Sequence, residues 1–521
     1  MTAAVPSLFS AVSVDYRALA PVLIVFVGAM VGVLVGAFVP RARRHVIQLV
    51  LALVTLVAAL LTLVLATVGH SAKTVGGSVV VDGPAMYLEG LLLVIAILAV
   101  LTFGERWGGY EADAFTPMGA ATPGSPQEAA ATRAGFTTSE VFPLALLATA
   151  GMMLFTSAND LITLFISLEV LSLPLYILTG LARRRRLLSQ EASLKYFLLG
   201  AFSSAFLLFG SALLYGYAGT VDYKGIAAAI VAGGSAYEPL LLPGILLVLV
   251  GLLFKIGAAP FQMWTPDVYQ GAPTPVTGFM AAGTKAAAFG AILRFGYVGV
   301  EAARWDWRWP VIVIAALTMV VGAVLSVTQT DMKRLLAYSS IAHAGFLLVG
   351  ILGFSKAGIS GVLFYLTAYA LSTVAAFAIV GMVRENGAEA SHLSQWAGLG
   401  KKHPVVAGTF ALLLLAFAGI PLTSGFTAKF AAFAPAVTSG GRAGIALVVL
   451  AVLCSAVTAF VYIRVIVLMY FTEVAPSEVE ALMPSALTTV VVTFGAAATV
   501  ILGVYPGPVL DLAANAAQFL R

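Results

Sequence analysis

Cysteine and charged residues are scarce in this sequence. The single cysteine, Cys454, excludes a disulfide framework and any cysteine-ligated metal or iron–sulfur site within the chain. Only 10% of the 521 residues are charged and 61% are hydrophobic, a balance that excludes a water-soluble domain. No haem, flavin or nucleotide motif is present. The net charge of +5 does not predict a nucleic-acid partner. In a membrane protein, the loops in which the basic residues lie indicate its orientation instead.

Long apolar runs make up most of what is present. The N-terminus lacks the basic region, short apolar run and cleavage site of a signal peptide, so its first apolar segment is expected to remain as a span. Fourteen runs are long enough to cross about 30 Å of hydrocarbon. They fall near residues 18–39, 46–69, 84–103, 140–158, 160–181, 193–217, 239–263, 273–299, 309–328, 333–354, 357–383, 404–433, 443–471 and 484–505. The sequence therefore predicts an all-α polytopic membrane protein with about fourteen transmembrane helices.

The loops between these runs predict their orientation. Fourteen lysine and arginine residues fall in loops after odd-numbered spans, against eight on the opposite side. Because basic loops remain on the inner side of a membrane, both termini are expected outside the cell, which an even number of spans also requires. The longest polar insertion, residues 104–140, predicts a surface loop. Residues 509–520 are a candidate for a segment along the membrane face.

Charged residues inside the predicted spans are the candidates for function. These residues are Lys195, Lys255, Lys285, Arg294, Lys429, Arg464, Glu89, Glu169 and His343. An isolated charge in hydrocarbon costs on the order of 3 kcal/mol on insertion scales, so such residues usually have a function. Lys255, Lys285 and Lys429 lie deep in three different spans, and Glu169 is the only acid at comparable depth. At least two lysines therefore lack a counter-charge, and burial and mutual repulsion favour a neutral form that can accept a proton.

Several of these residues have a simpler structural interpretation. Glu169 could neutralise one lysine only to hold two helices together. Lys195 lies close to the start of its span and could extend its ammonium group to the surface, so it is a secondary relay candidate. Arg294 and Arg464 lie near span ends or on a helix face that the sequence does not assign, and they are expected to be structural.

His343 is the one histidine near mid-membrane. A lone histidine in a helix is usually a packed core group. Here Tyr338, Ser339 and Ser340 precede it and supply hydroxyl groups that can hold water. Because imidazole ordinarily titrates near pH ~6.5, this setting favours a role in proton relay.

Two predicted helices contain breaks beside lysines. The first lies at residues 257–260 and includes Pro260, and the second lies at 419–425 and includes Pro421, four residues before Lys429. Proline inside a helix frees a backbone carbonyl, which is tolerated at membrane depth only where protein or water satisfies it. Ordinary proline kinks are the alternative. Paired interruptions beside charges predict an ion site, as in transporters built from inverted repeats.

Five segments resemble a known family, the antiporter-like membrane subunits of respiratory complex I. They are LITLFISLEVLSLPLYIL, EASLKYFLLGAFSSAFLLFGSALLYG, LLFKIGAAPFQMWTPDVYQGAPTPVTGFMAAGTKAAAF, QTDMKRLLAYSSIAHAGFLLVG and AGIPLTSGFTAKF. The resemblance covers roughly residues 140–470, and its motifs are specific to the superfamily. The lysine at position 429 and the end of the chain at Arg521 favour one member type, because another usually has glutamate there and a third extends well past fourteen spans.

The resemblance implies a domain organisation. Two inverted five-helix repeats, each with one broken helix, would form the centre of the chain. The implied segments are an N-terminal three-helix segment with the polar loop (1–139), the first repeat (140–299), the second repeat (309–471), and the last span with a C-terminal tail (484–521).

The resemblance also implies roles for individual residues. Glu169 would pair with Lys255 and set the proton affinity of that lysine. Lys285 and His343 would belong to a central hydrated axis, and Lys429 would be its terminal group.

The implied function is proton translocation in the membrane arm of an NADH:quinone oxidoreductase of a bacterial cell membrane. NADH, FMN, iron–sulfur clusters and quinone would then be bound by partner subunits, with no cofactor or metal in this chain. Neighbouring membrane and peripheral subunits and lipids are the expected partners. Two alternatives remain: a subunit of a multi-subunit sodium/proton antiporter or membrane-bound hydrogenase of the same superfamily, and a passive membrane scaffold.

Overall fold

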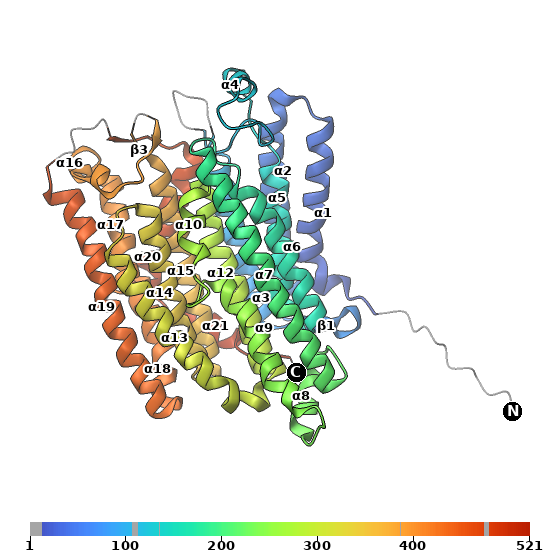
Figure 1. The fold of residues 1–521 in the computed structure, drawn as a ribbon. Helices are drawn as coiled ribbons and strands as arrows, with labels where there is room; N and C mark the ends of the chain where they lie inside the picture. Colours follow the sequence, from blue (N-terminus) through green and yellow to red (C-terminus); the bar gives the residue numbers. More distant parts are fainter. Residues whose placement is uncertain (1–12, 107–112, 135, 386, 474–478, 521) are drawn as a thin grey trace.

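Helices that run from one end of the molecule to the other make up most of the chain (Figure 1). The computed structural model describes residues 13–106, 113–134, 136–385, 387–473 and 479–520. Twelve helices of these residues are long and apolar enough to cross a membrane. Helix α5 (Val141–Ser157) makes another crossing, and the pair α17 (Pro404–Ala418) and α18 (Ser424–Ser439) makes one more. The predicted all-α fold with fourteen spans is confirmed.

The remaining elements follow the chain in order. Up to the eighth crossing the helices are α1 (Tyr16–Phe38), α2 (Arg41–Thr62), α3 (Gly83–Phe103), α4 (Pro126–Arg133), α6 (Leu161–Thr179), α7 (Arg186–Ala218), α8 (Tyr223–Ala232), α9 (Leu241–Ile256), α10 (Trp264–Gly271), α11 (Thr274–Phe279) and α12 (Lys285–Arg294). The later helices are α13 (Arg304–Val327), α14 (Met332–Ile351), α15 (Lys356–Met382), α16 (Leu399–Lys402), α19 (Gly441–Phe471), α20 (Ala486–Val504) and α21 (Gly507–Ala516).

Short strands close two loops outside the bundle. Strands β1 (Ala72–Thr74) and β2 (Val79–Val81) form an antiparallel hairpin between α2 and α3. Strand β3 (Val383–Glu385) pairs antiparallel with β4 (Ala388–Glu389) on one side and with β5 (Val479–Ala481) on the other.

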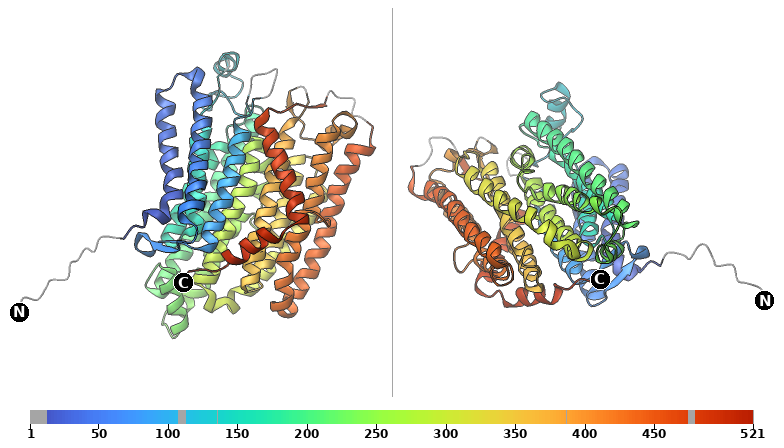
Figure 2. Two further views of the ribbon diagram at one scale, coloured as in Figure 1. Left: turned by 180° about the vertical axis from the view of Figure 1, so that it is seen from behind. Right: turned by 60° about the horizontal axis from the view of Figure 1, so that its bottom comes forward.

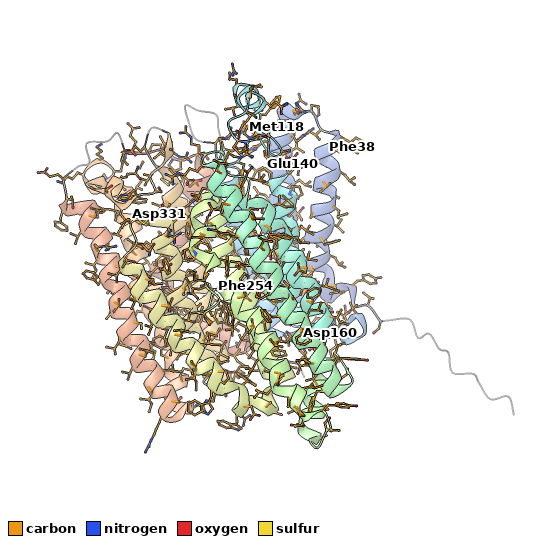
Figure 3. All side chains as sticks on the ribbon, viewed as in Figure 1. Phe38, Met118, Glu140, Asp160, Phe254 and Asp331 are labelled. Atoms are coloured by element: carbon orange, nitrogen blue, oxygen red, sulfur yellow. The ribbon has the colours of Figure 1, made fainter. Side chains whose placement is uncertain are left out.

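The molecule has two distinct ends. One holds the loops with Arg183–Arg186 and Arg384, and we call it the arginine-rich end. Figure 3 shows Phe38 and Asp331 at this end and Asp160 at the other. Helix α1 begins at the end opposite the arginine-rich one. The basic loops after odd-numbered spans therefore gather on one side of the bundle, as the sequence predicts.

Large apolar side chains are exposed on the outer helices. Examples with more than half of the side chain exposed are Val33 on α1, Val54 on α2, Phe209 on α7, Val313 on α13 and Leu453 on α19. A water-soluble protein rarely exposes apolar surface of this extent, whereas a helix that faces lipid does. The outer surface is thus suited to hydrocarbon.

The two repeats meet along buried helices. Helix α10 packs on α14, and helices α11 and α12 pack on α15. Every residue of α12 is buried, and α14 and α15 are nearly as enclosed. Helices α1–α3 flank the first repeat, while α20 packs on α15 and α18. The junction between the repeats is therefore the interior of the molecule.

Helix α21 crosses the bundle instead of spanning it (Figure 2). It packs across α15 and α3, and the backbone N–H of Leu520 donates to Asp82 at the start of α3 (3.0 Å). This helix covers most of the stretch 509–520 that the sequence marks as a segment along the membrane face.

The first helix break begins at Gly257, the first residue of the predicted stretch 257–260. Helix α9 ends at Ile256 because Gly257 adopts a left-handed backbone (φ 73°), and the chain resumes as α10. The freed backbone is satisfied by protein: the indole of Trp264 donates to the Phe254 carbonyl, and Thr318 accepts from Ala259 N–H. The predicted span 239–263 was too short, since α10 completes the crossing to Gly271. Helix α10 contains polar residues, so the hydropathy of the sequence does not indicate it.

The second break repeats this design. Helix α17 ends at Ala418, Gly419 takes a left-handed backbone (φ 83°), and the chain passes Pro421 before α18 begins at Ser424. In both repeats a glycine ends the first half-helix and a proline follows within a few residues.

Gly425 allows the two halves of the second broken helix to approach each other. A Cβ atom at this position would lie 1.7 Å from the carbonyl oxygen of Ala416. We expect Gly425→Ala to destabilise the protein by about 1–3 kcal/mol, because overpacking displaces backbone here and not a flexible side chain. Thermal unfolding and native gel electrophoresis measure this loss. Gly507→Ala, where a Cβ meets no atom within 4 Å, is the control and should leave both unchanged.

Candidate site: a buried line of basic residues

Four buried basic side chains lie on four helices of the two repeats. They are Lys255 on α9, Lys285 on α12, His343 on α14 and Lys429 on α18, and we call them the buried basic line. None is more than 7% exposed. Phe254, next to the first of them, lies between the two ends of the bundle (Figure 3). In the part of the chain that the structure describes, no ion pair involves any of the four.

Lys255 occupies the last turn of α9, just before the break. Its ammonium group donates to the Ser172 hydroxyl (2.7 Å) and lies 5.2 Å from the ring centre of Tyr196 and 5.6 Å from that of Tyr176. A desolvated cation over an aromatic face gains about 2 kcal/mol. Aromatic faces and one hydroxyl group thus take the place of a counter-ion.

Glu169 is one turn away from Ser172 on α6 but does not contact Lys255 directly. One of its oxygens is buried without a hydrogen-bond partner. Its charge reaches Lys255 through space, while the lysine donates to Ser172. The pairing that the resemblance implies is therefore a longer-range electrostatic interaction in this structure.

Lys285 follows a widened helical turn. Residues Met280–Thr284 form a π-helical turn between α11 and α12, a feature that often accompanies functional sites. The Lys285 ammonium donates to the backbone carbonyl of Ser340 on α14 and lies 5.4 Å from the ring centre of Tyr369 on α15. This lysine therefore connects the first repeat to the second.

His343 shares the aromatic ring that Lys285 approaches. Its imidazole lies 4.9 Å from Tyr369 and 5.8 Å from Phe417, centre to centre. Its Nδ1 shares a hydrogen bond with the Tyr365 hydroxyl (2.8 Å), whereas its Nε2 is buried without a partner. One ring nitrogen is thus held in place and the other is available for a proton.

Lys429 lies at the C-terminal end of the half-helix α17. Its ammonium donates to the carbonyls of Phe417 (3.0 Å) and Ala418 (2.8 Å) and to the Ser455 hydroxyl (2.7 Å). These carbonyls have no partner within α17, and the negative end of the helix dipole favours a cation here. Lys255 differs, because it belongs to the half-helix before its own break and donates to Ser172 on α6.

Aromatic side chains connect Lys285, His343 and Lys429, and the sequence analysis did not identify these aromatic residues. Tyr369 lies beside both Lys285 and His343, and Phe346 lies 5.1 Å from the Lys429 ammonium and 5.6 Å from the His343 ring. Tyr196 stacks on Trp264 at 4.7 Å next to Lys255. The only available signal was the presence of aromatic residues in the same spans as the lysines, which alone indicates core packing.

Lys195 lies apart from this line. Its side chain is 43% exposed and forms ion pairs with Glu191 (2.7 Å) and Asp267 (2.8 Å). Asp267, on α10, also pairs with Arg334 at the start of α14 (2.6 Å). The three charges join α7, α10 and α14 near the arginine-rich end, a contact that sequence reasoning missed because the residues are far apart in the chain.

Two arginines, the buried Arg294 and the partly buried Arg464, belong to helix packing. Arg294 makes a two-pronged ion pair with Asp82 (2.6 and 3.0 Å) that joins α12 to the start of α3. Arg464 donates to the carbonyls of Val327 and Gln329 at the end of α13. Glu89, on α3, is fully buried, and neither of its oxygens has a hydrogen-bond partner. Among the described residues, no three histidine, cysteine, aspartate or glutamate side chains gather as metal ligands.

Comparisons with known proteins show which family the chain belongs to. A model of the family described as NADH:quinone oxidoreductase/Mrp antiporter, TM, matches residues 158–458. NADH-quinone oxidoreductase subunit N 3 of Streptomyces griseus subsp. griseus is 53% identical, with 100% of this chain and 97% of that protein covered. The subunit N of Salinispora arenicola is 55% identical, with 98% and 99% covered.

Solved structures show the same fold. A chain of respiratory complex I from Thermus thermophilus superimposes with a TM-score of 0.75 at 33% identity, covering 95% of this chain and 99% of its own. A chain of the Mrp complex from Dietzia sp. DQ12-45-1b reaches 0.77 at 22% identity, with 96% and 97% covered, which is a likeness of fold alone. The resemblance noted in the sequence is confirmed, and the chain belongs to the subunit N family of the NADH-quinone oxidoreductases.

Proposed function

We propose that this chain translocates protons as a membrane subunit of an NADH-quinone oxidoreductase, using the buried basic line. The observation that carries the proposal is that four basic groups are buried in the two repeats without an ion-paired acid among the described residues. Shared aromatic side chains join three of them, Lys285, His343 and Lys429. A cation held only to fix helix packing would be expected to have a carboxylate partner.

Each member of the line can hold or release one proton. The ammonium groups of Lys285 and Lys429 flank the imidazole of His343, so a proton on one of them disfavours a proton on the next. Hydroxyl groups of Tyr365 and Ser455 lie within hydrogen-bond distance of the line and can pass a proton or orient water. Protons would therefore move stepwise, from Lys255 toward Lys429 or in the reverse direction.

In our proposal Glu169 passes a change of charge in a neighbouring subunit on to the relay. A change of charge in a neighbouring subunit would alter the field of Glu169 at Lys255 and so change the proton affinity of that lysine. Moving one charge across 100 mV requires about 2.3 kcal/mol, which the redox chemistry of partner subunits would supply. NADH, FMN, iron–sulfur clusters and quinone belong to those partners.

The arginine-rich end is proposed to face the cytoplasm. Support comes from the excess of lysine and arginine in its loops and from the positive-inside tendency of membrane proteins. In this orientation both termini lie outside, in a bacterial cell membrane.

Two other functions compete with this one. A subunit of a sodium/proton antiporter or membrane-bound hydrogenase would use the same fold, but the Mrp likeness is confined to fold at 22% identity. A passive scaffold would need the lysines only for packing.

Purification of the tagged chain from its native membrane in mild detergent discriminates among the partner assignments. We expect NADH-dependent quinone reduction and the spectra of flavin and iron–sulfur centres to co-purify with it. Recovery with other membrane subunits alone, without a redox centre, would favour the antiporter function instead.

A further inference from the structure

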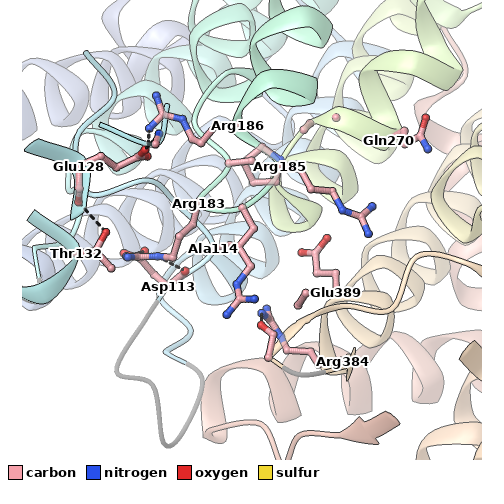
Figure 4. Close-up of a pocket in the computed structure, with 18 of the residues that line it drawn as sticks. Asp113, Ala114, Glu128, Thr132, Arg183, Arg185, Arg186, Gln270, Arg384 and Glu389 are labelled. Carbon is pink, nitrogen blue, oxygen red and sulfur yellow. Dashed lines mark hydrogen bonds and ion pairs between the residues drawn. The ribbon is translucent and has the colours of Figure 1, made fainter. Parts of the chain in front are cut away.

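A cavity at the arginine-rich end lies outside the buried basic line (Figure 4). Its volume is about 740 Å³. Its walls come from the segment around α4, the loop between α6 and α7, the end of α10, the start of α14 and residues of strands β3 and β4. Segments of both repeats and of the long polar insertion therefore meet around one space.

The cavity lining has an excess of positive charge. Its charged residues are Arg133, Arg183, Arg184, Arg185, Arg186, Lys333, Arg384, Asp113, Glu128 and Glu389. Each acid is already paired: Asp113 with Arg183 (2.6 Å), Glu128 with Arg186 (2.6 Å) and Glu389 with Lys333 (3.5 Å). The lining thus holds seven basic residues against three acidic ones, so the space is suited to an anion.

Arginines approach each other from opposite walls. Burial lowers the pKa of Arg384, the charge of Glu389 opposes this, and repulsion from Arg184 adds to the lowering. Arg184 has no hydrogen bond or ion pair with any residue that the structure describes. Among the described residues, Arg185 donates only to the Ser391 hydroxyl (2.9 Å). An anion between these walls would relieve the repulsion and accept hydrogen bonds from the guanidinium groups of Arg184 and Arg185.

A helix N-terminus points to the same class of ligand. Helix α7 has 33 residues and begins at Arg186, and its N-cap, Arg185, provides no side-chain hydrogen bond. The first backbone N–H groups of α7 thus have no partner within the helix, and the positive end of its dipole lies at the cavity wall. Arg185 holds a left-handed backbone (φ 57°), a conformation that a non-glycine residue rarely adopts. Such strain often accompanies binding sites.

We propose that this cavity binds a phosphate-bearing anion through Arg184, Arg185 and the N-terminal amides of α7. Guanidinium groups match phosphate oxygens with two parallel hydrogen bonds, which favours phosphate over a small halide ion. The source is either the headgroup of an anionic phospholipid, since the cavity lies at the end of the bundle where headgroups would lie, or a soluble phosphate compound.

The bound anion would stabilise the junction between the repeats. Lys333 at the cavity floor donates to the Ala272 carbonyl (2.8 Å) and the Thr274 hydroxyl (3.2 Å), which links the start of α14 to the chain just after α10. A ligand that bridges Arg184 and Arg384 would link the loop of the first repeat to the turn of the second. Thermal stability is therefore a suitable readout.

The test uses the purified intact complex after removal of native lipid by detergent exchange. Wild type is compared with Arg184→Gln/Arg185→Gln, and with Lys401→Gln/Lys402→Gln as a control that removes two exposed charges from the same end. The probes are phosphatidylglycerol, phosphatidylcholine, and inorganic phosphate against chloride at equal ionic strength. The measured quantity is the melting temperature as a function of probe concentration.

We expect phosphatidylglycerol, inorganic phosphate or both to raise the melting temperature of wild type and of the lysine control. The arginine variant should need about tenfold more probe or more, because it lacks charge-assisted hydrogen bonds. Protection by phosphatidylglycerol alone identifies a lipid headgroup, and protection by inorganic phosphate identifies a soluble ligand. Equal protection of the arginine variant and wild type, or no protection of wild type, would overturn the proposal.

A second variant addresses loss of assembly. If the glutamine variant does not assemble, Arg184→Lys/Arg185→Lys is tested in its place. This variant keeps both charges but removes the planar guanidinium groups that donate two parallel hydrogen bonds. Weaker protection of this variant than of wild type supports the site, whereas unchanged protection contradicts it.

Discussion

Replacing Lys255 with methionine is expected to remove most proton translocation and to leave the complex assembled. Methionine fills a similar volume, and removing a buried charge is frequently neutral for stability. Ser172 keeps a hydrogen bond to the Leu168 carbonyl when the lysine is absent, so no buried hydroxyl loses its only partner. Because a positioned proton donor or acceptor contributes about 10²–10⁴ in rate, translocation should fall by at least about tenfold.

NADH-driven acidification of inverted membrane vesicles, followed with a pH-sensitive dye, measures this effect, and a native gel measures assembly. Lys195→Met is the control, since Lys195 is half-exposed and lies apart from the buried basic line. It should retain near wild-type acidification. Normal acidification by a well-assembled Lys255→Met complex would rule out the relay, and parallel loss of assembly and activity would support a scaffold.

At Lys429, a neutral and a negative substitution should differ in their effect on thermal stability. Lys429→Gln removes the proton carrier but can still donate to the Phe417 and Ala418 carbonyls. Lys429→Glu places a carboxylate against those carbonyls and the negative end of the α17 dipole, an unfavourable interaction of up to about 2 kcal/mol. We expect both variants to lose translocation, and the glutamate variant also to lose thermal stability.

Thermal unfolding of the two purified complexes tests the difference. The glutamine variant should melt close to wild type and the glutamate variant clearly below it. Equal melting temperatures would show that the carbonyls and dipole at the end of α17 do not interact with the charge at position 429.

The overall architecture was predictable because the length of the apolar runs decides the number of spans. Fourteen spans and two helix breaks follow from apolar runs and from glycine and proline positions, and the structure confirms them. Helix α10 was missed, because Asp267 and Gln270 make it polar and contacts with α7 and α14 help to enclose it. Hydropathy does not record such tertiary contacts.

The depth of the lysines could be read from the sequence, but their partners could not. Lys255, Lys285 and Lys429 are all buried, as their positions within spans predict. That Lys255 donates to Ser172 and not to Glu169 depends on how α6 and α9 are rotated against each other. The aromatic contacts of Tyr369 likewise arise between helices distant in sequence. No local pattern encodes these distances.

The central claim is that the members of the buried basic line act in series. The most direct test is the number of protons translocated per NADH oxidised in proteoliposomes, for Lys255→Met, for Lys429→Gln and for the double variant. In a serial relay the double variant loses no more than the more impaired single variant, because one interruption already blocks the path. A double variant whose residual translocation equals the product of the two single effects, or a full proton yield in either single variant, would contradict the account.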